Sequence, residues 1–543
     1  MKRLLTWILT MALLCCILPV ASAAGSSYTD VPVDSWALSE IETAKTLGLM
    51  QGQGNGRFGY DKTMTRAEFV TMLCNLMQWK TVTPAKPSYT DVASSAWYYG
   101  AVETAAANGA VDPGGAFRPT AAITRSEMAV MFVRALGLQS AAELAEDLES
   151  PFTDVTTNCG YITVAYDLGI VNGKGSGIFA PGATAKRQEA AAMIVRVYER
   201  YRGDTTFTHG FYAISSYSQK NLAARMDAVT YMWSELRQDG SLDTASGTFC
   251  VPDGYDSIVT YLSDSDVAQN LGVYMDVTGG AAELLLDSSA RSAAVDAILA
   301  EVTKSYDLIG GNPYGGVTMD IEGLRGTAAR SAYTAFLKEL SAGLDKLGKT
   351  LYVAVQPALP DGSYYDGYDY RTIGELADKV ILMAHDYEPA DQSDYVGTSW
   401  QQNAALTPID QVYYALKAVT DSETGVADRS KLVLAISFDA VAWQIDDQGK
   451  LVSGKPVSVS LNRVAELLAG GAQPQYSQTY RNPYLIYEAD DGDRLFLWYE
   501  DSRSVSEKLA LARFFGVSGV SVWRLGNLPA SDAYDVADLL LPS

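Results

Sequence analysis

The chain has few histidines and few cations for its length of 543 residues. Its two histidines, His209 and His385, are not spaced as metal ligands, so no histidine-based metal site and no cofactor are expected. Lys and Arg number 41 against 64 Asp and Glu, a formal net charge of −23, and no basic stripe occurs. A phosphate backbone would be repelled by this charge, which argues against nucleic acid as a partner.

Cysteine is also scarce. Two of the five cysteines lie in the first apolar run, which leaves Cys74, Cys159 and Cys250, far apart along the chain. An odd number of widely separated cysteines does not suit a disulfide framework. The fold must therefore be held by packing and hydrogen bonds.

Long hydrophobic runs are absent except at the N-terminus. Lys2 and Arg3 precede the apolar run Leu4–Val20, and Ala21-Ser22-Ala23 follows it as a small-x-small cleavage pattern. Residues 1–23 are therefore predicted to be a signal peptide. The alternative is a transmembrane anchor, but no second apolar run follows. We expect an exported protein with no transmembrane segment after cleavage.

A repeat occupies the first 200 residues. Tyr28-Thr-Asp-Val returns as Tyr89-Thr-Asp-Val and Phe152-Thr-Asp-Val, at intervals of about 60 residues. Each copy is followed by a helical stretch, a glycine-rich turn and a second apolar-periodic helix. That helix opens with Thr65-Arg-Ala-Glu, Thr124-Arg-Ser-Glu or Lys186-Arg-Gln-Glu. Thr with Glu three residues later predicts a capping box in the first two copies, whereas the third keeps only the Glu.

These motifs resemble the S-layer homology family, with repeats at residues 28–80, 89–140 and 152–202. The resemblance implies a helical pseudo-trimer at the bacterial surface whose grooves bind an anionic secondary cell-wall polysaccharide. The residues that carry it, and that it assigns to the wall anchor, are Asp30, Trp36, Arg66, Asp91, Trp97, Arg125 and Arg187. A motif Arg would contact the acidic sugar as a planar bidentate donor. The alternative is that Arg and Glu are only solvated cap residues.

The third copy departs from the other two, because Cys159-Gly160 stands where they have Trp. Its groove is therefore expected to be weak or structural.

From residue 206 the pattern changes to short apolar runs separated by helical stretches. Eight runs with little polar alternation are predicted as strands buried on both faces: 211–215, 228–232, 271–275, 317–321, 351–355, 380–383, 432–436 and 519–523. The best intervening helix is predicted from Thr327 to Leu347, ended by Gly348. Eight strands with helices over residues 206–543 predict a TIM barrel. The alternative, a doubly wound sheet, lacks its glycine-rich phosphate turn.

The stretch between the last two strands is unusually long. Tyr484–Glu488 and Arg494–Glu500 predict an inserted β-hairpin, which could form one wall of a cleft. A helix after it is predicted to start with a capping box of Ser504 and Glu507. The whole chain is thus expected to be multidomain, with a helical pseudo-trimer before an α/β barrel that carries a hairpin subdomain.

Two carboxylates mark the end of the fourth predicted strand. Asp320 and Glu322 are two residues apart, so both side chains point to the same side, into the barrel mouth. Carboxylates this close cannot both ionise freely, which supplies a general acid near neutral pH. The alternative is a hydrogen-bonded structural pair. Asp386 and Trp523 follow two other strands and would reach the same rim.

Together these residues resemble glycoside hydrolase family 18, and within it the spore-cortex and cell-wall N-acetylglucosaminidases. The family signature Asp-x-x-Asp-x-Asp-x-Glu falls on Gly315, Thr318, Asp320 and Glu322, so only its last two acids are present. The resemblance implies that Glu322 is the acid/base and that Asp320 holds the N-acetyl group of the substrate. It further assigns five residues to substrate binding: Asp386, His385, Met383, Trp523 and Tyr212.

Three functions remain open from the sequence. The leading one is a wall-anchored glycosidase that cleaves β-linked N-acetylglucosamine polymers by substrate-assisted, retaining catalysis, with peptidoglycan favoured over chitin. The second is a lectin-like surface protein that binds glycans in the same groove without cleaving them. The third is a structural surface-layer component. The retained pair Asp320 and Glu322 favours the enzyme, and the missing acids leave room for the lectin.

Overall fold

A computed structural model describes residues 26–148, 150–358, 366–385, 387, 391–528 and 540–541. The predicted signal peptide, residues 1–23, lies outside the described residues. Within them, no helix combines the length and the apolar character needed to cross a membrane. Cys74, Cys159 and Cys250 are all free thiols, and Cys74 is buried.

The chain divides into two compact units. The first contains the chain up to Ala107 together with Pro113–Arg125 and Gly182–Arg196. The second contains Asn108–Asp112, Ser126–Pro181 and everything from Val197 onward. The second unit therefore includes part of the repeat region as well as the whole barrel.

The repeat region is helical, as expected. Its helices are α2 (Leu38–Thr46), α3 (Arg66–Met77), α4 (Tyr99–Ala107), α5 (Arg125–Ala135), α6 (Gln139–Ala145), α7 (Cys159–Asp167) and α8 (Arg187–Tyr201). The predicted capping box of α3 is confirmed: the Thr65 hydroxyl accepts from the Glu68 amide at 3.2 Å, and Glu68 accepts from the Thr65 amide at 2.9 Å. At α8, Glu189 keeps its half of the motif by accepting from the Lys186 amide at 2.7 Å.

The three repeats meet in a cyclic junction inside the first unit. Antiparallel bridges join Thr65 to Ala122, Thr124 to Thr184 and Thr63 to Lys186. These bridges connect the first repeat to the second, the second to the third and the third back to the first. The predicted pseudo-trimer is therefore confirmed.

The departure of the third repeat has a packing cause. An additional helix, α6, precedes the repeat, and its C-cap residue Glu146 accepts from the amides of Cys159 and Gly160 at 3.2 and 2.8 Å. A Cβ atom on Gly160 would lie 1.8 Å from the Ala142 carbonyl oxygen. The close approach of α6 and α7 therefore leaves no space for a larger side chain at Gly160, next to Cys159.

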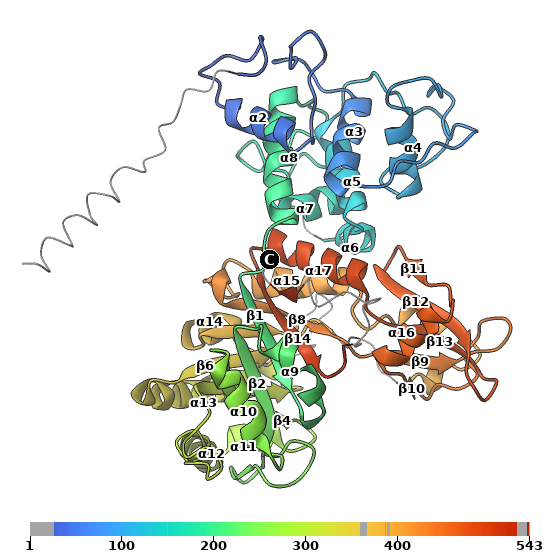
Figure 1. Cartoon of the computed structure of the whole chain (residues 1–543). Coiled ribbons are helices and arrows are strands. Elements are labelled where there is room, and N and C mark those ends of the chain that lie inside the picture. The colour runs from blue at the N-terminus through green and yellow to red at the C-terminus, as the bar shows by residue number, and fades with distance from the viewer. Residues whose placement is uncertain are drawn as a thin grey trace, which may run out of the picture. The chain divides into compact units, whose positions relative to one another are not determined.

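The second unit contains a closed barrel of eight parallel strands (Figure 1). They are β1 (Phe207–Tyr212), β2 (Ala228–Leu236), β4 (Ala268–Asp276), β5 (Gly316–Glu322), β6 (Thr350–Val355), β7 (Lys379–Leu382), β8 (Leu432–Ser437) and β14 (Gly519–Leu525). Each strand pairs with its neighbours in order, β1 pairs with both β2 and β14, and the short β3 (Leu242–Asp243) is added antiparallel to β2. The predicted TIM barrel is confirmed.

All eight predicted runs overlap barrel strands, but the first strand, β1, starts four residues before the predicted run 211–215 and ends three residues before its end. The chain turns into a 3₁₀ helix, η1 (Ile214–Gln219), directly after β1, because β1 already ends at Tyr212. The strand that corresponds to the sixth run, β7, ends at Leu382, one residue before the predicted end, so Met383 follows β7 rather than lying in it. Helix α13 (Gly326–Leu347) agrees with the prediction, and Gly348 ends it with a φ of 65°.

Helices surround the strands in Figure 1. The remaining helices of the barrel domain are α9 (Lys220–Ala223), α10 (Tyr255–Asp264), α11 (Ala281–Leu286), α12 (Ser288–Glu301), α14 (Tyr370–Leu376), α15 (Ile409–Val419) and α17 (Ser502–Phe514), with 3₁₀ turns η2 (Ser393–Tyr395), η3 (Trp400–Asn403) and η4 (Arg429–Lys431). Repeat helices α6 and α7 also contact α15, since Tyr414 donates to the Ala141 carbonyl at 2.9 Å and Lys417 pairs with Asp167 at 2.6 Å.

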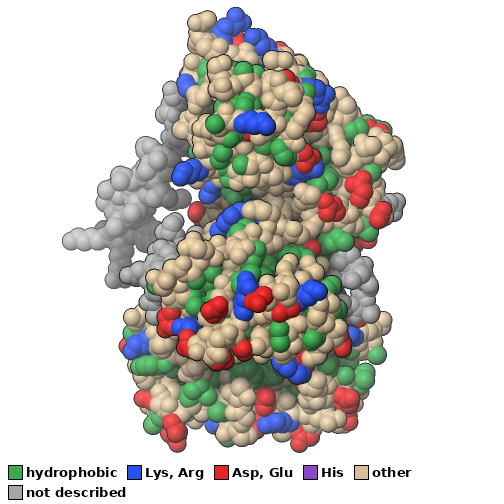
Figure 2. Space-filling view, turned by 90° about the vertical axis from the view of Figure 1, so that its right-hand side faces the viewer, with side chains coloured by type: hydrophobic (Ala, Val, Ile, Leu, Met, Phe, Trp, Pro, Cys, Tyr) green, Lys and Arg blue, Asp and Glu red, His purple; other side chains and the backbone are tan. Residues whose placement is uncertain are grey.

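The predicted hairpin is confirmed, but it belongs to a larger five-stranded antiparallel sheet inserted between β8 and β14. The strands are β9 (Val441–Gln444), β10 (Val457–Ser458), β11 (Gln475–Ser477), β12 (Asn482–Glu488) and β13 (Arg494–Trp498), in the order β10-β9-β13-β12-β11, with helix α16 (Leu461–Ala469) between β10 and β11. Trp443, Phe496 and Trp498 form its core. On the face drawn in Figure 2, Lys and Arg are scattered among Asp and Glu and form no basic stripe.

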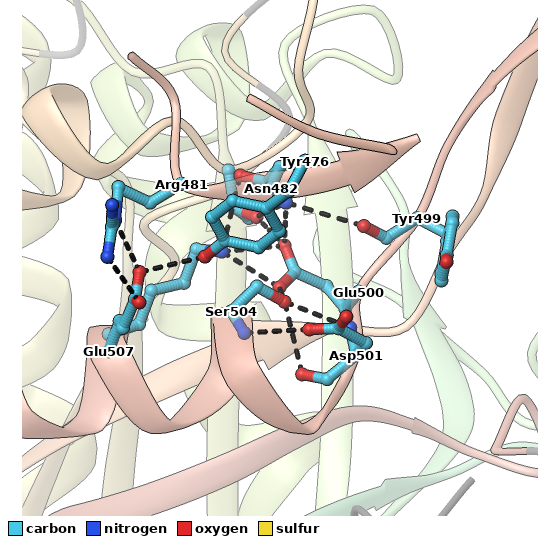
Figure 3. A network of polar contacts seen from close by, with 10 residues as sticks. Tyr476, Arg481, Asn482, Tyr499, Glu500, Asp501, Ser504 and Glu507 are labelled. Atoms are coloured by element: carbon cyan, nitrogen blue, oxygen red, sulfur yellow. Dashed lines mark hydrogen bonds and ion pairs between the residues drawn. The ribbon is translucent and has the colours of Figure 1, made fainter. Parts of the chain in front are cut away.

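A polar network joins this inserted sheet to α17 (Figure 3). The predicted capping box of Ser504 and Glu507 is wrong: α17 begins one turn earlier, with Asp501 as the N-cap that accepts from the Ser504 amide at 2.8 Å. Glu507 instead forms a bidentate pair with Arg481, at 2.5 and 2.6 Å, and accepts from Tyr476 at 2.8 Å.

At the centre of the same network, Glu500 pairs with Lys508 at 2.8 Å, and both are almost fully buried. Glu500 also accepts from Ser504 and from Asn482, at 2.6 and 2.7 Å. Removing one member of such a buried pair typically costs about 3–5 kcal/mol, because an unpaired charge is left without solvent. The inserted sheet is therefore held in a defined position on the last barrel helix.

Candidate active site and anchor groove

The predicted carboxylates stand at the C-terminal end of β5. Asp320 is fully buried and Glu322 is half-buried. On the neighbouring strand β4, Tyr274 lies beside Asp320 and Asp276 lies beside Glu322 in the strand register. Alternation along both strands turns all four side chains to the inside of the barrel.

Asp320 is electrostatically unusual. Burial, and then the nearby charge of Glu322, raise the pKa of its carboxyl well above the ordinary value. Neither of its oxygens has a hydrogen-bond partner among the residues that the structure describes. A buried polar group without a partner costs stability in a folded protein, so an unsatisfied carboxyl at a barrel mouth suggests a functional role. This carboxyl can hold a proton and offer both oxygens to a ligand.

Asp276 and Tyr274 are site residues that the sequence reasoning missed. Burial would raise the pKa of Asp276, but hydrogen bonds from Thr278, from the Gly279 amide and from Tyr274 hold it below the ordinary value. The donor–acceptor distances are 2.7, 2.7 and 3.3 Å. An ionised Asp276 therefore lies beside Glu322 and orients the Tyr274 hydroxyl. A Tyr and an Asp at the end of an apolar strand were the signal available in the sequence.

Gln356 and Tyr368, also missed, hold the backbone on both sides of Glu322. The Tyr368 hydroxyl donates to the Ile321 carbonyl at 2.7 Å, and Gln356 accepts from the Gly323 amide at 2.6 Å. Tyr368 and Gln356 also contact each other at 3.2 Å. The backbone that presents Glu322 is thus fixed by two neighbouring segments, which limits where its carboxyl can move.

The interior of the barrel around these acids is apolar and partly aromatic. Phe211, Met232 and Met383 belong to its buried cluster, and Trp523 packs edge-on against Phe211 with ring centroids 5.2 Å apart. Tyr274 and Phe249 lie against the same cluster. The structure thus places Trp523 and Met383, both assigned to substrate binding by the family resemblance, in or against this interior cluster, and their role in binding stays a prediction.

Tyr212 does not reach this interior. It is buried against Tyr231 and Trp233, with ring centroids 5.5 and 6.5 Å away. Phe211 faces inward, and adjacent residues of a strand point to opposite faces, so Tyr212 faces the surrounding helices. The structure therefore does not bring Tyr212 to the barrel interior with Trp523 and Met383.

A second layer of polar side chains lies beneath the acids. His209 contacts Ser521 at 2.8 Å and Thr230 at 2.7 Å, and Thr230 contacts Thr318 at 2.6 Å. Burial lowers the pKa of His209 to about 3, so the imidazole is neutral. Thr318, which replaces a signature acid, is therefore part of an uncharged floor.

Two predicted substrate-binding residues, His385 and Asp386, follow β7, and Gly315, at the position of the first signature acid, precedes β5. His385 is half-buried just beyond the strand end, and Asp386 lies outside the described residues. Gly315 directly precedes β5, and its amide donates to the Gln269 carbonyl at 2.7 Å. Gly315 has no side chain to replace the first signature acid.

In the repeats, Asp30 and Asp91 hold the glycine-rich turns. Asp30 accepts from the amides of Phe58, Gly59 and Tyr60 at 2.7–3.2 Å, and Asp91 accepts from those of Phe117 and Arg118 at 2.7 and 2.8 Å. Burial would raise the pKa of Asp30, but these bonds hold it below the ordinary value. Both carboxylates are thereby occupied within their own repeats.

The motif arginines reach into the neighbouring repeat. Arg66 donates from Nε to the Phe117 carbonyl at 2.8 Å, and Arg187 donates from Nε to the Phe58 carbonyl at 2.9 Å. Arg187 also donates to the Gln51 carbonyl at 2.8 Å and pairs with Glu68 at 2.7 Å. Arg66 and Arg187 thus make the same type of contact with the next repeat, a bond from Nε to the carbonyl of the Phe that ends its glycine-rich turn.

Arg187 lines a groove of about 660 Å³ together with Gln51–Gln53, Glu68 and Trp97. The Trp97 side chain is 68% exposed, and the corresponding Trp36 is 62% exposed. Arg125 begins α5 and is half-buried. The groove thus combines residues of the first repeat with a Trp from the second and an Arg from the third, so the third repeat contributes a side chain to it.

Two families match the chain. The model of glycosyl hydrolases family 18 matches residues 207–527, and the S-layer homology domain matches residues 27–70, 88–129 and 151–191. A surface layer protein of Brevibacillus choshinensis is 36% identical over 144 residues, 26% of this chain and 13% of that protein. The repeats indicate a cell-surface protein anchored to the wall.

Two curated relatives come from Bacillus subtilis. A putative sporulation-specific glycosylase, YdhD, is 26% identical over 225 residues, 41% of this chain and 50% of that protein. A cortical fragment-lytic enzyme is 28% identical over 216 residues, 39% of this chain and 46% of that protein. The chain thus spans about half the length of these relatives.

Among solved structures, the spore cortex-lytic enzyme SleL of Bacillus cereus aligns with a TM-score of 0.48 and 19% identity, covering 62% of this chain and 74% of that one. The family 18 model alone covers more than half of the sequence. The chain therefore belongs to the glycosyl hydrolases family 18, and it carries three S-layer homology repeats ahead of its barrel.

Proposed function

We propose that the protein is a wall-anchored glycosidase that hydrolyses β-linked N-acetylglucosamine-containing polysaccharide, with peptidoglycan favoured over chitin. The observation that carries the proposal is the buried Asp320, whose two oxygens have no partner among the described residues, beside the half-buried Glu322. The names of the Bacillus subtilis relatives, a sporulation-specific glycosylase and a cortical fragment-lytic enzyme, support a cell-wall glycan as substrate.

Glu322 is the proposed general acid. Two carboxyls on one strand and facing one side cannot both ionise at low cost, so the pair retains a proton near neutral pH. In the resting protein the buried Asp320 holds this proton. Glu322 is the more exposed member and its backbone is fixed by Gln356 and Tyr368, so it is the one placed to receive the proton from Asp320 and pass it to the leaving oxygen. Loss of that proton leaves a carboxylate that can activate water in the second step.

Asp320 is too constrained to be a nucleophile. Retaining glycosidases ordinarily place a second carboxylate about 5 Å from the acid, on the opposite face of the sugar, whereas family 18 uses the substrate's own N-acetyl group. Asp320 lies two residues from Glu322 on β5 and cannot attack from the opposite face. We therefore assign the attack on the anomeric carbon to the N-acetyl oxygen of the substrate, with Asp320 orienting the amide.

The groove of the first unit is the proposed wall anchor. An exposed Trp97 offers a flat apolar face to a sugar, and Arg187 places a guanidinium in the same groove, which suits an anionic polysaccharide. Arg187 is buried and paired with Glu68, so part of its charge is already balanced. We therefore infer that Trp97 contributes more of the binding energy than Arg187.

The first prediction concerns anchoring. Trp97→Ala in the chain without its signal peptide should lower the amount that pellets with purified cell wall about tenfold or more, because a stacking aromatic is lost. Val33→Ala is the matched control, since Val33 is an exposed apolar residue of the same unit, at 77% against 68% for Trp97. Pelleting by Trp97→Ala that equals the control would rule out this groove as the anchor.

The second prediction concerns the acid. Glu322→Gln should lower the rate at which reducing ends are released from peptidoglycan by a factor of about 10²–10⁴, as expected for loss of a general acid. Glycan binding should persist, and Glu339→Gln on the exposed face of α13 should cleave normally. Glycan binding without any cleavage by the unaltered protein would instead support the lectin-like function.

The third prediction concerns the desolvated carboxyl. The native pKa of Asp320 is raised, so above about pH 4 the unfolded chain ionises this group while the native protein keeps its proton. Native stability is therefore lost as pH rises towards the native pKa. Asp320→Asn should remove this loss and melt at a higher temperature than the unaltered protein at pH 7, by about 2–4 °C per kcal/mol.

That difference in melting temperature should shrink as the pH falls towards 4, the ordinary range of an Asp carboxyl. Asp428→Asn is the control of opposite sign, because hydrogen bonds from Ser430 lower the pKa of Asp428. A melting temperature of Asp320→Asn that stays at or below that of the unaltered protein from pH 4 to 8 would contradict the assignment.

The fourth prediction concerns substrate assistance. A matched polymer in which the N-acetyl groups are replaced by free amines should bind but resist hydrolysis, because no acetyl oxygen is available to attack. The anomeric configuration of the product from the acetylated polymer should be retained, as read by NMR during the first turnovers. Comparable rates on the two polymers, or an inverted product, would exclude this mechanism.

A further inference from the structure

The rim of the barrel between β14 and η1 is tightly connected. Ser216 donates to the Leu525 carbonyl, and the Gly526 amide donates to Gln219 at 2.6 Å. Arg524 directly follows Trp523, and its Nη1 donates to the Ser215 hydroxyl at 2.7 Å. The guanidinium is thereby held at the end of β14, the end of the barrel at which catalytic groups of this fold lie.

Within the part of the chain that the structure describes, no acid balances the charge of Arg524. Among the described residues, no carboxylate lies within ion-pair distance of it, and the Ser215 hydroxyl is its hydrogen-bond partner. Other arginines of this acidic chain differ: Arg187 pairs with Glu68, and Arg481 with Glu507. Most of the guanidinium N–H groups of Arg524 therefore have no partner among the described side chains and could donate to a ligand.

An aromatic ring is fixed on the same rim. Tyr217 of η1 is 45% exposed, yet its hydroxyl contacts the Ser257 hydroxyl at 2.9 Å. The Lys220 ammonium lies 4.8 Å from the ring centroid and donates to the Tyr217 hydroxyl at 3.3 Å. An exposed ring with restricted motion loses little entropy when a sugar stacks on it. Lys220 adds a second cation close to the ring.

From this arrangement we infer that the rim formed by Ser215, Tyr217, Lys220 and Arg524 is a subsite for a sugar that carries a carboxylate. The inference rests on the proposed glycosidase function and deepens it. In peptidoglycan, the sugar next to each N-acetylglucosamine carries a lactyl ether that ends in a carboxylate or a peptide with free carboxylates. Chitin carries none. Arg524 would bind the carboxylate through parallel N–H donors, while Tyr217 contacts the sugar ring.

The decisive comparison uses two forms of one substrate: peptidoglycan glycan with free carboxylates, and the same material with its carboxylates converted to methylamides. The protein should cleave the acid form with a kcat/KM about ten- to hundredfold higher, the range expected for a charge-assisted hydrogen bond. Raising the salt concentration should reduce this ratio, because the rim is solvent-exposed.

Arg524→Gln, which removes the positive charge but keeps an uncharged N–H donor on a shorter side chain, should bring the ratio of the two kcat/KM values close to one. Arg524→Ala provides a second variant. Lys338→Ala, at an exposed position of α13, removes one positive charge elsewhere and should leave the ratio as in the unaltered protein. Equal kcat/KM on both forms in the unaltered protein, or a preference that survives in Arg524→Gln, would overturn the inference.

Failure of the proposed function would be visible separately, as the absence of cleavage on every glycan. Binding of the two glycan forms by calorimetry then tests the subsite on its own. Tighter binding of the acid form that Arg524→Gln abolishes supports the subsite, and equal binding of both forms overturns it.

Discussion

The desolvation of the Asp320 carboxyl is the constraint on which the rest of the barrel depends. A carboxyl with no partner among the described residues, next to a second acid, is unfavourable for folding, so the surrounding structure must prevent it from relaxing. Gln356 and Tyr368 fix the backbone after Asp320, and the apolar barrel interior keeps water away. This rigidity is also what a catalytic acid requires, because its proton must be aimed at one oxygen.

The floor beneath the acids shows how the chain adapts to two missing signature acids. Thr318 joins Thr230 and the neutral His209 in an uncharged hydrogen-bonded layer, and Gly315 contributes only backbone. Neither Thr318 nor Gly315 has a carboxylate that could share a proton with Asp320. Its ionisation is thus governed by burial, by Glu322 and by whatever occupies the mouth. The neighbouring strand β4 carries an ionised acid, Asp276, which lies beside Glu322 at the rim and not in the layer beneath Asp320.

The two proposed binding surfaces differ in the charge that they present. The repeat groove places an Arg that is already paired with Glu68 beside an exposed Trp. The barrel rim carries Arg524 without an acid partner among the described residues, beside the fixed ring of Tyr217. In a chain of net charge −23, long-range attraction of anionic glycan is weak, so local cations and aromatic faces must provide recognition.

Local patterns in the sequence determined the three repeats, the eight strands and the pair Asp320 and Glu322. A capping box, an apolar run and a spacing of two residues are each specified by neighbouring residues. The tertiary structure alone decided which face of β1 is internal, that Asp276 lies beside Glu322, and that Trp97 and Arg187 share one groove. These features depend on where strands end, on the register between strands and on packing between repeats. A shift of one residue at a strand end or helix start is enough to change which side chains face each other.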